Sequence, residues 1–210
     1  EDVFLNPDIS RQLVSDAKEL ATIERSWKLF SSRAFDDPYA FKLCSTGNAI
    51  AELAIAIQTM EGIRKNIEQF LETKRMVFPR LYLLSNSEFI NLLSKPKDAQ
   101  SLIPYLPRMF TGINNLEYIM DGNTPSIASI ISDVGERVQI RPVKYHTNIE
   151  IWLQGLCESM QKTVKNDLRA TQQKRNEMIR EDWIQVSTTQ CVLIVSALER
   201  CREIESALSS

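Results

Sequence analysis

The chain has 210 residues, of which 43% are hydrophobic and 25% charged, a balance typical of a folded protein and not of a disordered one. Its formal net charge of -2 creates no basic field, which argues against nucleic acid or an anionic membrane as a partner. No apolar run approaches the roughly 20 residues that span a bilayer, and residues 1–6 carry no secretory signal, so we expect a soluble, non-secreted protein.

Residues 9–30 and 48–78 carry the clearest helical patterns. In each range apolar residues recur at spacings of three and four, which predicts a buried stripe along a helix. The second helix should stop at Phe78, because Pro79 lacks a backbone N–H and disfavours the helical conformation in the residue before it. Residues 32–48 collect turn formers and predict a connection with one short helical turn.

The sequence after this proline predicts short elements. Residues 80–84 are expected to be extended. Ser85 and Glu88 then form an S-x-x-E capping box, in which each side chain can satisfy a free backbone donor, so a short helix to Leu93 should follow. Another helix is expected to begin close to Pro104, where a missing donor costs least.

Residues 113–146 have a different character, with β-branched residues alternating around glycine turns. This pattern predicts a small antiparallel hairpin or three short strands. Helical rhythm returns at Asn148, and a last helix is expected over residues 182–208. Because nearly all of residues 191–198 are apolar, we expect that helix to be buried against more than one neighbour.

These patterns predict a mostly α fold of elongated antiparallel helical bundles with a small β-hairpin around residues 113–146. We expect three segments along the chain. They are a long-helix bundle over residues 1–78, a segment of corner, short helices and hairpin over residues 79–147, and a C-terminal two-helix segment over residues 148–210.

No complete catalytic, cofactor-binding or metal site can be assembled from the sequence. Neither a G-x-x-x-x-G-K-[ST] phosphate loop nor a G-x-G-x-x-G fingerprint is present. His146 is the only histidine, and we interpret it as a loop or strand-end residue. A hydrolase that used this histidine or a cysteine would need a pocket converging on it. Four scattered cysteines are expected to be reduced and packed in the core; they are Cys44, Cys157, Cys191 and Cys201.

Six basic residues follow the penultimate helix. We interpret them as a solvated face because acidic residues interleave with them; the alternative is a contact surface for an acidic partner. They are Lys162, Lys165, Arg169, Lys174, Arg175 and Arg180.

The most informative stretch is residues 74–85. Lys74 and Arg75 end a long helix, where cations oppose the negative end of the helix dipole. Apolar residues then crowd a proline-fixed corner that includes Arg80. They are Phe78, Pro79, Leu81, Tyr82 and Leu83. The corner is either a rigid elbow that joins two helices or a joint that passes force from one helical segment to the next.

Here the sequence resembles a known family, the dynein heavy chains. The FPR motif at residues 78–80, with LETKR before it at residues 71–75 and LSN after it at residues 84–86, looks like the signature of the dynein linker. Further matches follow in order along the chain. They are residues 106–113, Gly135 and Glu136 in the hairpin, and Glu150, Ile151, Trp152 and Leu153 at the start of the next helix.

The resemblance implies a lever. In dyneins the linker is a stack of helical bundles that arches over a ring of AAA+ ATPase modules and swings with the nucleotide cycle. By this resemblance the chain is the C-terminal half of the linker, just before the first module, and has no catalysis of its own. ATP and Mg would belong to the downstream ring. The implied partners are that ring and, through the parent complex, the microtubule and the dynein light and intermediate chains. The implied location is the cytoplasm and cytoskeleton, or the axoneme of a cilium or flagellum.

The resemblance also implies two groups of structural residues. The corner group is Lys74, Arg75, Phe78, Pro79, Arg80 and Tyr82, and the group in the hairpin and the following helix is Gly135, Glu136, Glu150, Trp152 and Leu153. A tie between Arg80 and Glu136 is a further hypothesis. The alternative function is a helical scaffold, adaptor or tethering subunit unrelated to motors.

Overall fold

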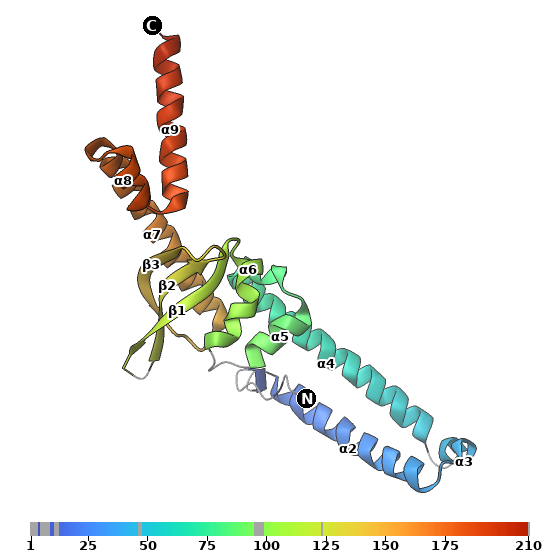
Figure 1. Ribbon diagram of the computed structural model, residues 1–210. Coiled ribbons are helices and arrows are strands. Elements are labelled where there is room, and N and C mark those ends of the chain that lie inside the picture. Colours follow the sequence, from blue (N-terminus) through green and yellow to red (C-terminus); the bar gives the residue numbers. More distant parts are fainter. Residues whose placement is uncertain are drawn as a thin grey trace. The chain divides into compact units, whose positions relative to one another are not determined.

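The computed structural model describes residues 4, 9–10, 13–45, 48–94, 99–122 and 124–209. The chain divides into two compact units, Glu1–Pro96 (unit 1) and Lys97–Ser210 (unit 2). The described residues are mostly helical with one small antiparallel sheet, which confirms the predicted fold class (Figure 1). The division into three segments with boundaries after residues 78 and 147 stays a prediction.

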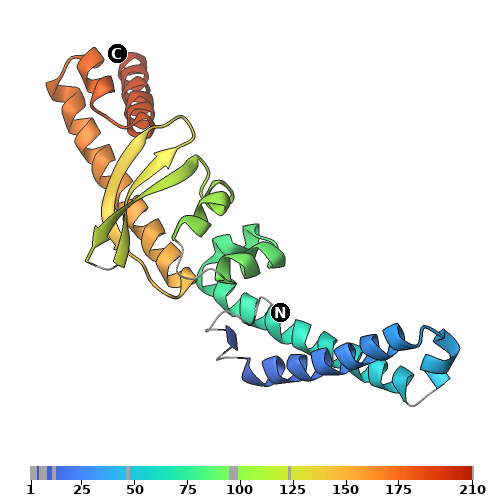
Figure 2. The ribbon, with the colours of Figure 1, turned by 60° about the horizontal axis from the view of Figure 1, so that its bottom comes forward.

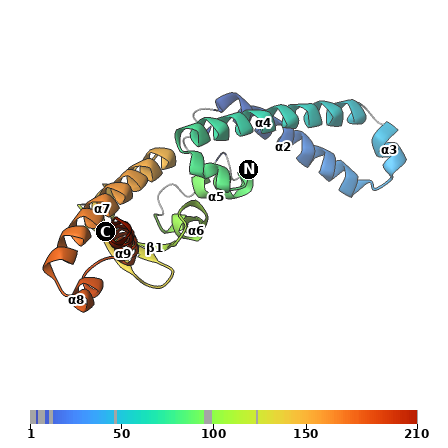
Figure 3. The same ribbon diagram turned by 90° about the horizontal axis from the view of Figure 1, so that it is seen from above.

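Unit 1 is built on two long antiparallel helices, α2 (Val14–Asp36) and α4 (Ala49–Val77) (Figures 1 and 3). The short helix α3 (Ala40–Ser45) joins them at one end. α4 confirms the strongest helical prediction. α2 runs past the predicted end at residue 30 and stops at Asp37, whose backbone is extended because a proline follows it.

The corner after α4 differs from its prediction. Phe78 is extended before Pro79, as expected. The extended stretch predicted for residues 80–84 is wrong: Pro79–Leu83 forms a 3-10 helix, η2. Proline favours the first position of a helical turn, and this turn directs Leu81 into the core.

The capping box that opens α5 (Asn86–Ser94) is confirmed. The backbone N–H of Ser85 donates to the Glu88 carboxylate over 3.0 Å, and the N–H of Glu88 donates to Ser85 Oγ over 3.3 Å. The apolar face of α5 then packs against α4. The buried hydrophobic side chains from α4 through η2 to α5 are Ile63, Phe70, Leu71, Phe78, Leu81, Leu84, Phe89, Leu92 and Leu93.

Unit 2 begins with η3 (Ala99–Tyr105), a 3-10 helix, and α6 (Leu106–Met109). An α-helix does begin close to Pro104, as predicted, but at Leu106, and Pro104 itself lies inside the preceding 3-10 helix. Three antiparallel strands follow in the order β1-β2-β3, and they confirm the three-strand alternative. They are β1 (Ile113–Asp121), β2 (Thr124–Ser132) and β3 (Arg137–Lys144).

The long helix α7 (Ile149–Glu177) packs against this sheet, as Figure 2 shows. A Cβ on Gly155 would lie 3.4 Å from Val143 Cγ1, so the glycine allows α7 to approach β3 closely. The buried hydrophobic side chains of unit 2 come from its helices, its sheet and the segments between them. They are Leu102, Leu106, Met109, Phe110, Leu116, Ile127, Ile140, Trp152, Leu153, Leu156, Met160, Trp183, Cys191 and Val195.

The single last helix predicted over residues 182–208 is wrong. The structure has two helices there, α8 (Arg180–Gln185) and α9 (Thr189–Leu208). Lys174 Nζ donates to the Val186 carbonyl over 3.5 Å, and extended backbone at Thr188 starts a new helix direction. Two side chains of α9 are buried, Cys191 and Val195, whereas Leu193 is 66% exposed, so within the described part of the chain the expected enclosure of this helix is also wrong.

The cysteines are only partly as predicted. All four are free thiols. Cys191 is buried and Cys157 is half-buried, but Cys44 and Cys201 are exposed, so their expected place in the core is wrong.

Candidate functional site

The two cations at the end of α4 bind parts of the corner together. Lys74 is buried, and its Nζ lies 5.2 Å from the centroid of the Phe70 ring. Arg75 Nη2 donates to the Leu84 carbonyl over 3.1 Å, beyond the 3-10 turn. Its guanidinium also lies 5.6 Å from the ring centroids of Tyr82 and of Phe89 on α5. Arg75 therefore holds the end of α4 to both elements that follow it.

Phe78 and Tyr82 occupy opposite environments in the same corner. Phe78 is 2% exposed and packs in the core, whereas Tyr82 is 53% exposed. The Tyr82 hydroxyl donates a hydrogen bond to the Glu72 carboxylate, and this bond raises the pKa of the phenol. Pro79 and Arg80 are exposed. The corner thus has an apolar interior and a polar outer surface.

The hairpin residues Gly135 and Glu136 form the turn between β2 and β3. Gly135 has φ of 87°, a conformation that favours glycine. The N–H of Glu136 donates to Ser132 Oγ over 2.9 Å. The Glu136 carboxylate then accepts a hydrogen bond from the backbone N–H of Thr189, the first residue of α9, over 2.7 Å. A side chain 53 residues away in the chain therefore caps the last helix.

Of the residues predicted at the start of α7, Glu150, Trp152 and Leu153 are buried, whereas Ile151 is exposed. Trp152 packs edge-on against Tyr145, with ring centroids 5.2 Å apart. Leu153 is fully enclosed, and Glu150 lies in the first turn of the helix, where a carboxylate opposes the positive end of the dipole. This turn is therefore anchored to unit 2 by both rings and apolar contacts.

The sequence predicted no site role for Trp183, a buried residue of α8 that packs against the C-terminal part of α7. Its Nε1 donates to the Thr171 carbonyl over 2.8 Å, and the Arg175 guanidinium lies 5.7 Å from its ring centroid. One of the six basic residues is thus used to cover a buried ring. Lys162, Lys165 and Arg169 are exposed, as expected for a solvated face.

The described residues contain no group of three or more His, Cys, Asp or Glu side chains placed to hold a metal ion. His146 is exposed after β3, and its Nδ1 accepts a hydrogen bond from the Asn148 N–H over 3.0 Å, which confirms its interpretation as a strand-end residue. No helix in the described ranges combines the length and hydropathy that crossing a membrane requires.

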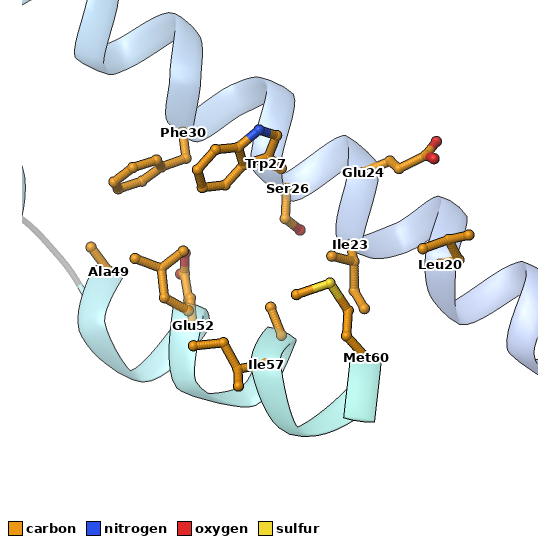
Figure 4. Close-up of a pocket in the computed structure, with 12 residues that line it drawn as sticks. Leu20, Ile23, Glu24, Ser26, Trp27, Phe30, Ala49, Glu52, Ile57 and Met60 are labelled. Atoms are coloured by element: carbon orange, nitrogen blue, oxygen red, sulfur yellow. The ribbon is translucent and has the colours of Figure 1, made fainter. Parts of the chain in front are cut away.

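Unit 1 also contains an open apolar groove between α2 and α4 (Figure 4). We call it the hairpin groove after this antiparallel pair of helices, which is separate from the β-hairpin of unit 2. It has a volume of about 470 Å³. Sequence reasoning placed its apolar side chains in a core and missed that they remain accessible. The residues that line it are Leu20, Ile23, Glu24, Ser26, Trp27, Phe30, Ala49, Glu52, Leu53, Ala56, Ile57 and Met60.

The similar proteins named here are all dynein heavy chains. Residues 1–171 match the family described as "Dynein heavy chain, N-terminal region 2". The whole chain is 28% identical to part of dynein axonemal heavy chain 6 of Homo sapiens, covering 6% of that protein. It is 30% identical to dynein axonemal heavy chain 1 of Mus musculus over 88% of the chain and 4% of that protein. For dynein axonemal heavy chain 3 of Mus musculus the identity is 30%, over 99% of the chain and 5% of the relative.

The chain therefore spans a small fraction of the length of these relatives. The family match covers most of the chain, includes the corner, the hairpin and most of α7, and agrees with the mostly helical fold. The chain belongs to the dynein heavy chain family, through its N-terminal region 2.

Proposed function

We propose that this chain is a lever of a dynein motor, which bends and straightens over a ring of ATPase modules and so produces the stroke along a microtubule. The supporting observation is the capping of α9 by Glu136, because it links the last helix to the sheet. A lever must transmit displacement without deforming, and densely packed interiors resist deformation.

The contacts of unit 2 suit this role. α7 packs on β3 along the sheet, and Trp152 and Leu153 are buried at its start. α9 packs against α7, and Cys191 and Val195 are buried on it. With Glu136 bonded to Thr189, both the side and the beginning of α9 are held. A force on α9 then reaches the sheet and α7 through fixed contacts.

In this proposal the chain has no catalytic role, and ATP and Mg bind the ATPase modules of the same heavy chain. The partners are that ring and, through the complete complex, the microtubule and smaller dynein subunits. The relatives named above are axonemal, so we propose the axoneme of a cilium or flagellum as the place of action. Family membership favours this function over a scaffold unrelated to motors.

Energy transfer within the heavy chain tests the proposal. A donor on Cys44, which is exposed on α3, and an acceptor on an ATPase module should give two transfer efficiencies, one with ATP and one without nucleotide. In the heavy chain used for labelling, all other reactive cysteines are replaced. A lever must change its position relative to the ring between these states. The same transfer efficiency with ATP and without nucleotide would contradict the proposed lever function.

Glu136→Ala links this movement to the structure. The variant should lower microtubule gliding velocity several-fold while ATP turnover continues, because α9 is no longer capped from the sheet. Glu136→Gln keeps a carbonyl acceptor and should retain most of the velocity. Glu203→Ala is the matched control, since this exposed carboxylate also lies at α9. Equal effects of the Glu136 and Glu203 variants would refute the part assigned to the cap.

A further inference from the structure

The hairpin groove has the composition of a helix-packing surface without its third helix. Trp27 and Phe30 extend from α2 toward the part of α4 that carries Ala49, and Met60 on α4 lies beside Ile23 (Figure 4). Trp27 and Ile57 are each 56% exposed although both face a groove made almost wholly of apolar side chains. Two helices alone cannot enclose apolar faces this wide, because each leaves the side away from their contact open.

The groove continues along the helices toward α5. A second hollow shares Leu20 and Met60 with it and adds Ile63, Ile67 and Ile90. The combined trough follows α2 and α4 in the direction of their axes, so its shape matches a helix laid lengthwise between them. An occupant of this form would contact apolar side chains over several turns.

Charge narrows the chemistry of the occupant. The charged residues that line the hairpin groove are two carboxylates, Glu24 and Glu52. The second hollow adds Arg64 and Glu68, which form an ion pair with each other over 3.9 Å and so leave the net charge of the trough negative. A helix in the groove therefore gains from an apolar ridge at spacings of three and four with Lys or Arg on its flanks.

The length of the relatives points to the source of this helix. The chain aligns with 4% to 6% of the dynein heavy chains named above. A helix within the same polypeptide has a high effective concentration at the groove, and it would cover the apolar surface permanently. A transient partner would leave the groove open to aggregation between its binding events.

We infer that the hairpin groove is filled by an amphipathic helix from another part of the same heavy chain, with an apolar ridge flanked by basic residues. This helix completes a three-helix layer with α2 and α4. The inference uses family membership and the geometry of unit 1, and it does not depend on the lever function.

A matched pair of isoleucines on α4 provides the test. Ile57 lines the groove, whereas Ile55 is 64% exposed and does not line it. Ile57→Cys and Ile55→Cys are made separately in the heavy chain, labelled with a benzophenone maleimide, irradiated and mapped by mass spectrometry. Ile57→Cys should cross-link to an apolar segment with flanking Lys or Arg in the same polypeptide, and Ile55→Cys should not.

A mixture of heavy chains with light and heavy nitrogen identifies the source. Products that pair light with light and heavy with heavy support an occupant from the same polypeptide. Mixed products would show a second copy, and products with another subunit would show a separate partner; either result would overturn the inference. Absence of any Ile57→Cys product above the Ile55→Cys background would overturn it as well.

Charge reversal gives a second measurement. Glu52→Lys should increase amide hydrogen exchange of the cross-linked segment several-fold, because it places a cation against the basic flank. Glu61→Lys is the control, since Glu61 is exposed on α4 outside the groove. Circular dichroism of both variants confirms that the fold is retained. Equal rates of amide hydrogen exchange in the two variants would show that the bound helix does not carry the proposed basic residues on its flank.

Discussion

The two ends of α4 lie in different surroundings although their sequences carry the same apolar rhythm. Near Met60 its apolar side chains face the open hairpin groove, whereas near Phe70 and Leu71 they are enclosed by η2 and α5. Spacing therefore establishes which face of a helix is apolar, and neighbouring elements determine whether that face is buried. The corner owes its enclosure to a sharp change of chain direction directly after α4, which brings new apolar side chains back onto it.

The largest expected difference in the free energy of unfolding is between a variant at Phe78, in the enclosed corner, and a variant at Ile57, in the open groove. Phe78→Ala should lower the free energy of unfolding of the 210-residue chain by about 3 to 5 kcal/mol, because a buried ring is lost and a cavity remains. Ile57→Ala should cost less than about 1 kcal/mol, because the side chain is half accessible and alanine favours helix. Urea denaturation followed by circular dichroism measures both. Similar losses for the two variants would show that the open groove stabilises the chain as much as the corner does.

The next largest difference separates two tryptophans. Trp183→Phe removes the indole hydrogen bond to the Thr171 carbonyl and part of a buried ring, and it should cost about 1 to 3 kcal/mol. Trp27→Phe, in the hairpin groove, should change the free energy of unfolding by no more than about 0.5 kcal/mol. The same denaturation experiment compares them. A neutral Trp183→Phe would mean that the indole hydrogen bond adds nothing to the closure of α7.

A smaller effect is expected at the capping box. Ser85→Ala removes the hydroxyl that accepts the Glu88 N–H, and it should cost about 1 kcal/mol. Ser32→Ala changes an exposed serine within α2 and should be neutral or slightly stabilising. If both variants have the same midpoint of thermal unfolding, the box directs the start of α5 without stabilising it.

The smallest effect is the pH dependence at Tyr82. Its hydrogen bond to Glu72 raises the pKa of the phenol above the ordinary value of about 10, so its contribution to stability is complete below that pH. The contribution is lost as the pH rises through the raised pKa of the folded state. Tyr82→Phe should therefore lose less stability on going to alkaline pH than the parent chain.

Denaturation midpoints on both sides of pH 10, with Tyr39→Phe as the control, measure this difference. Tyr39 is an exposed tyrosine away from the corner, so that variant should keep the alkaline loss of the parent chain. Identical alkaline losses in all three proteins would rule out the Tyr82 and Glu72 bond as their source.

Local chemistry made parts of the fold predictable. Pro79 determines the end of α4, and Ser85 with Glu88 determines the start of α5, because each effect acts within a few residues. The β-branched alternation likewise located the sheet. The 3-10 turn at residues 79–83 was not predicted, since it depends on the burial of Leu81 and on the packing of η2 against α4.

Long-range contacts account for what was missed. The split between α8 and α9 depends on Lys174, Trp183 and Glu136, whose partners lie 12, 12 and 53 residues away. The corner and hairpin residues came from resemblance to a family. Phe78 is buried and Glu136 forms a long-range hydrogen bond, whereas Pro79 and Arg80 are exposed. Their mechanical role stays a prediction.

The bond between Glu136 and Thr189 also sets an order for folding. Its carboxylate belongs to a turn that closes between adjacent strands, whereas its donor begins the last helix. A hairpin forms quickly because little chain entropy is lost in closing a short loop. During synthesis from the N-terminus, we therefore expect the turn that carries the acceptor of this bond to form before α9 is made.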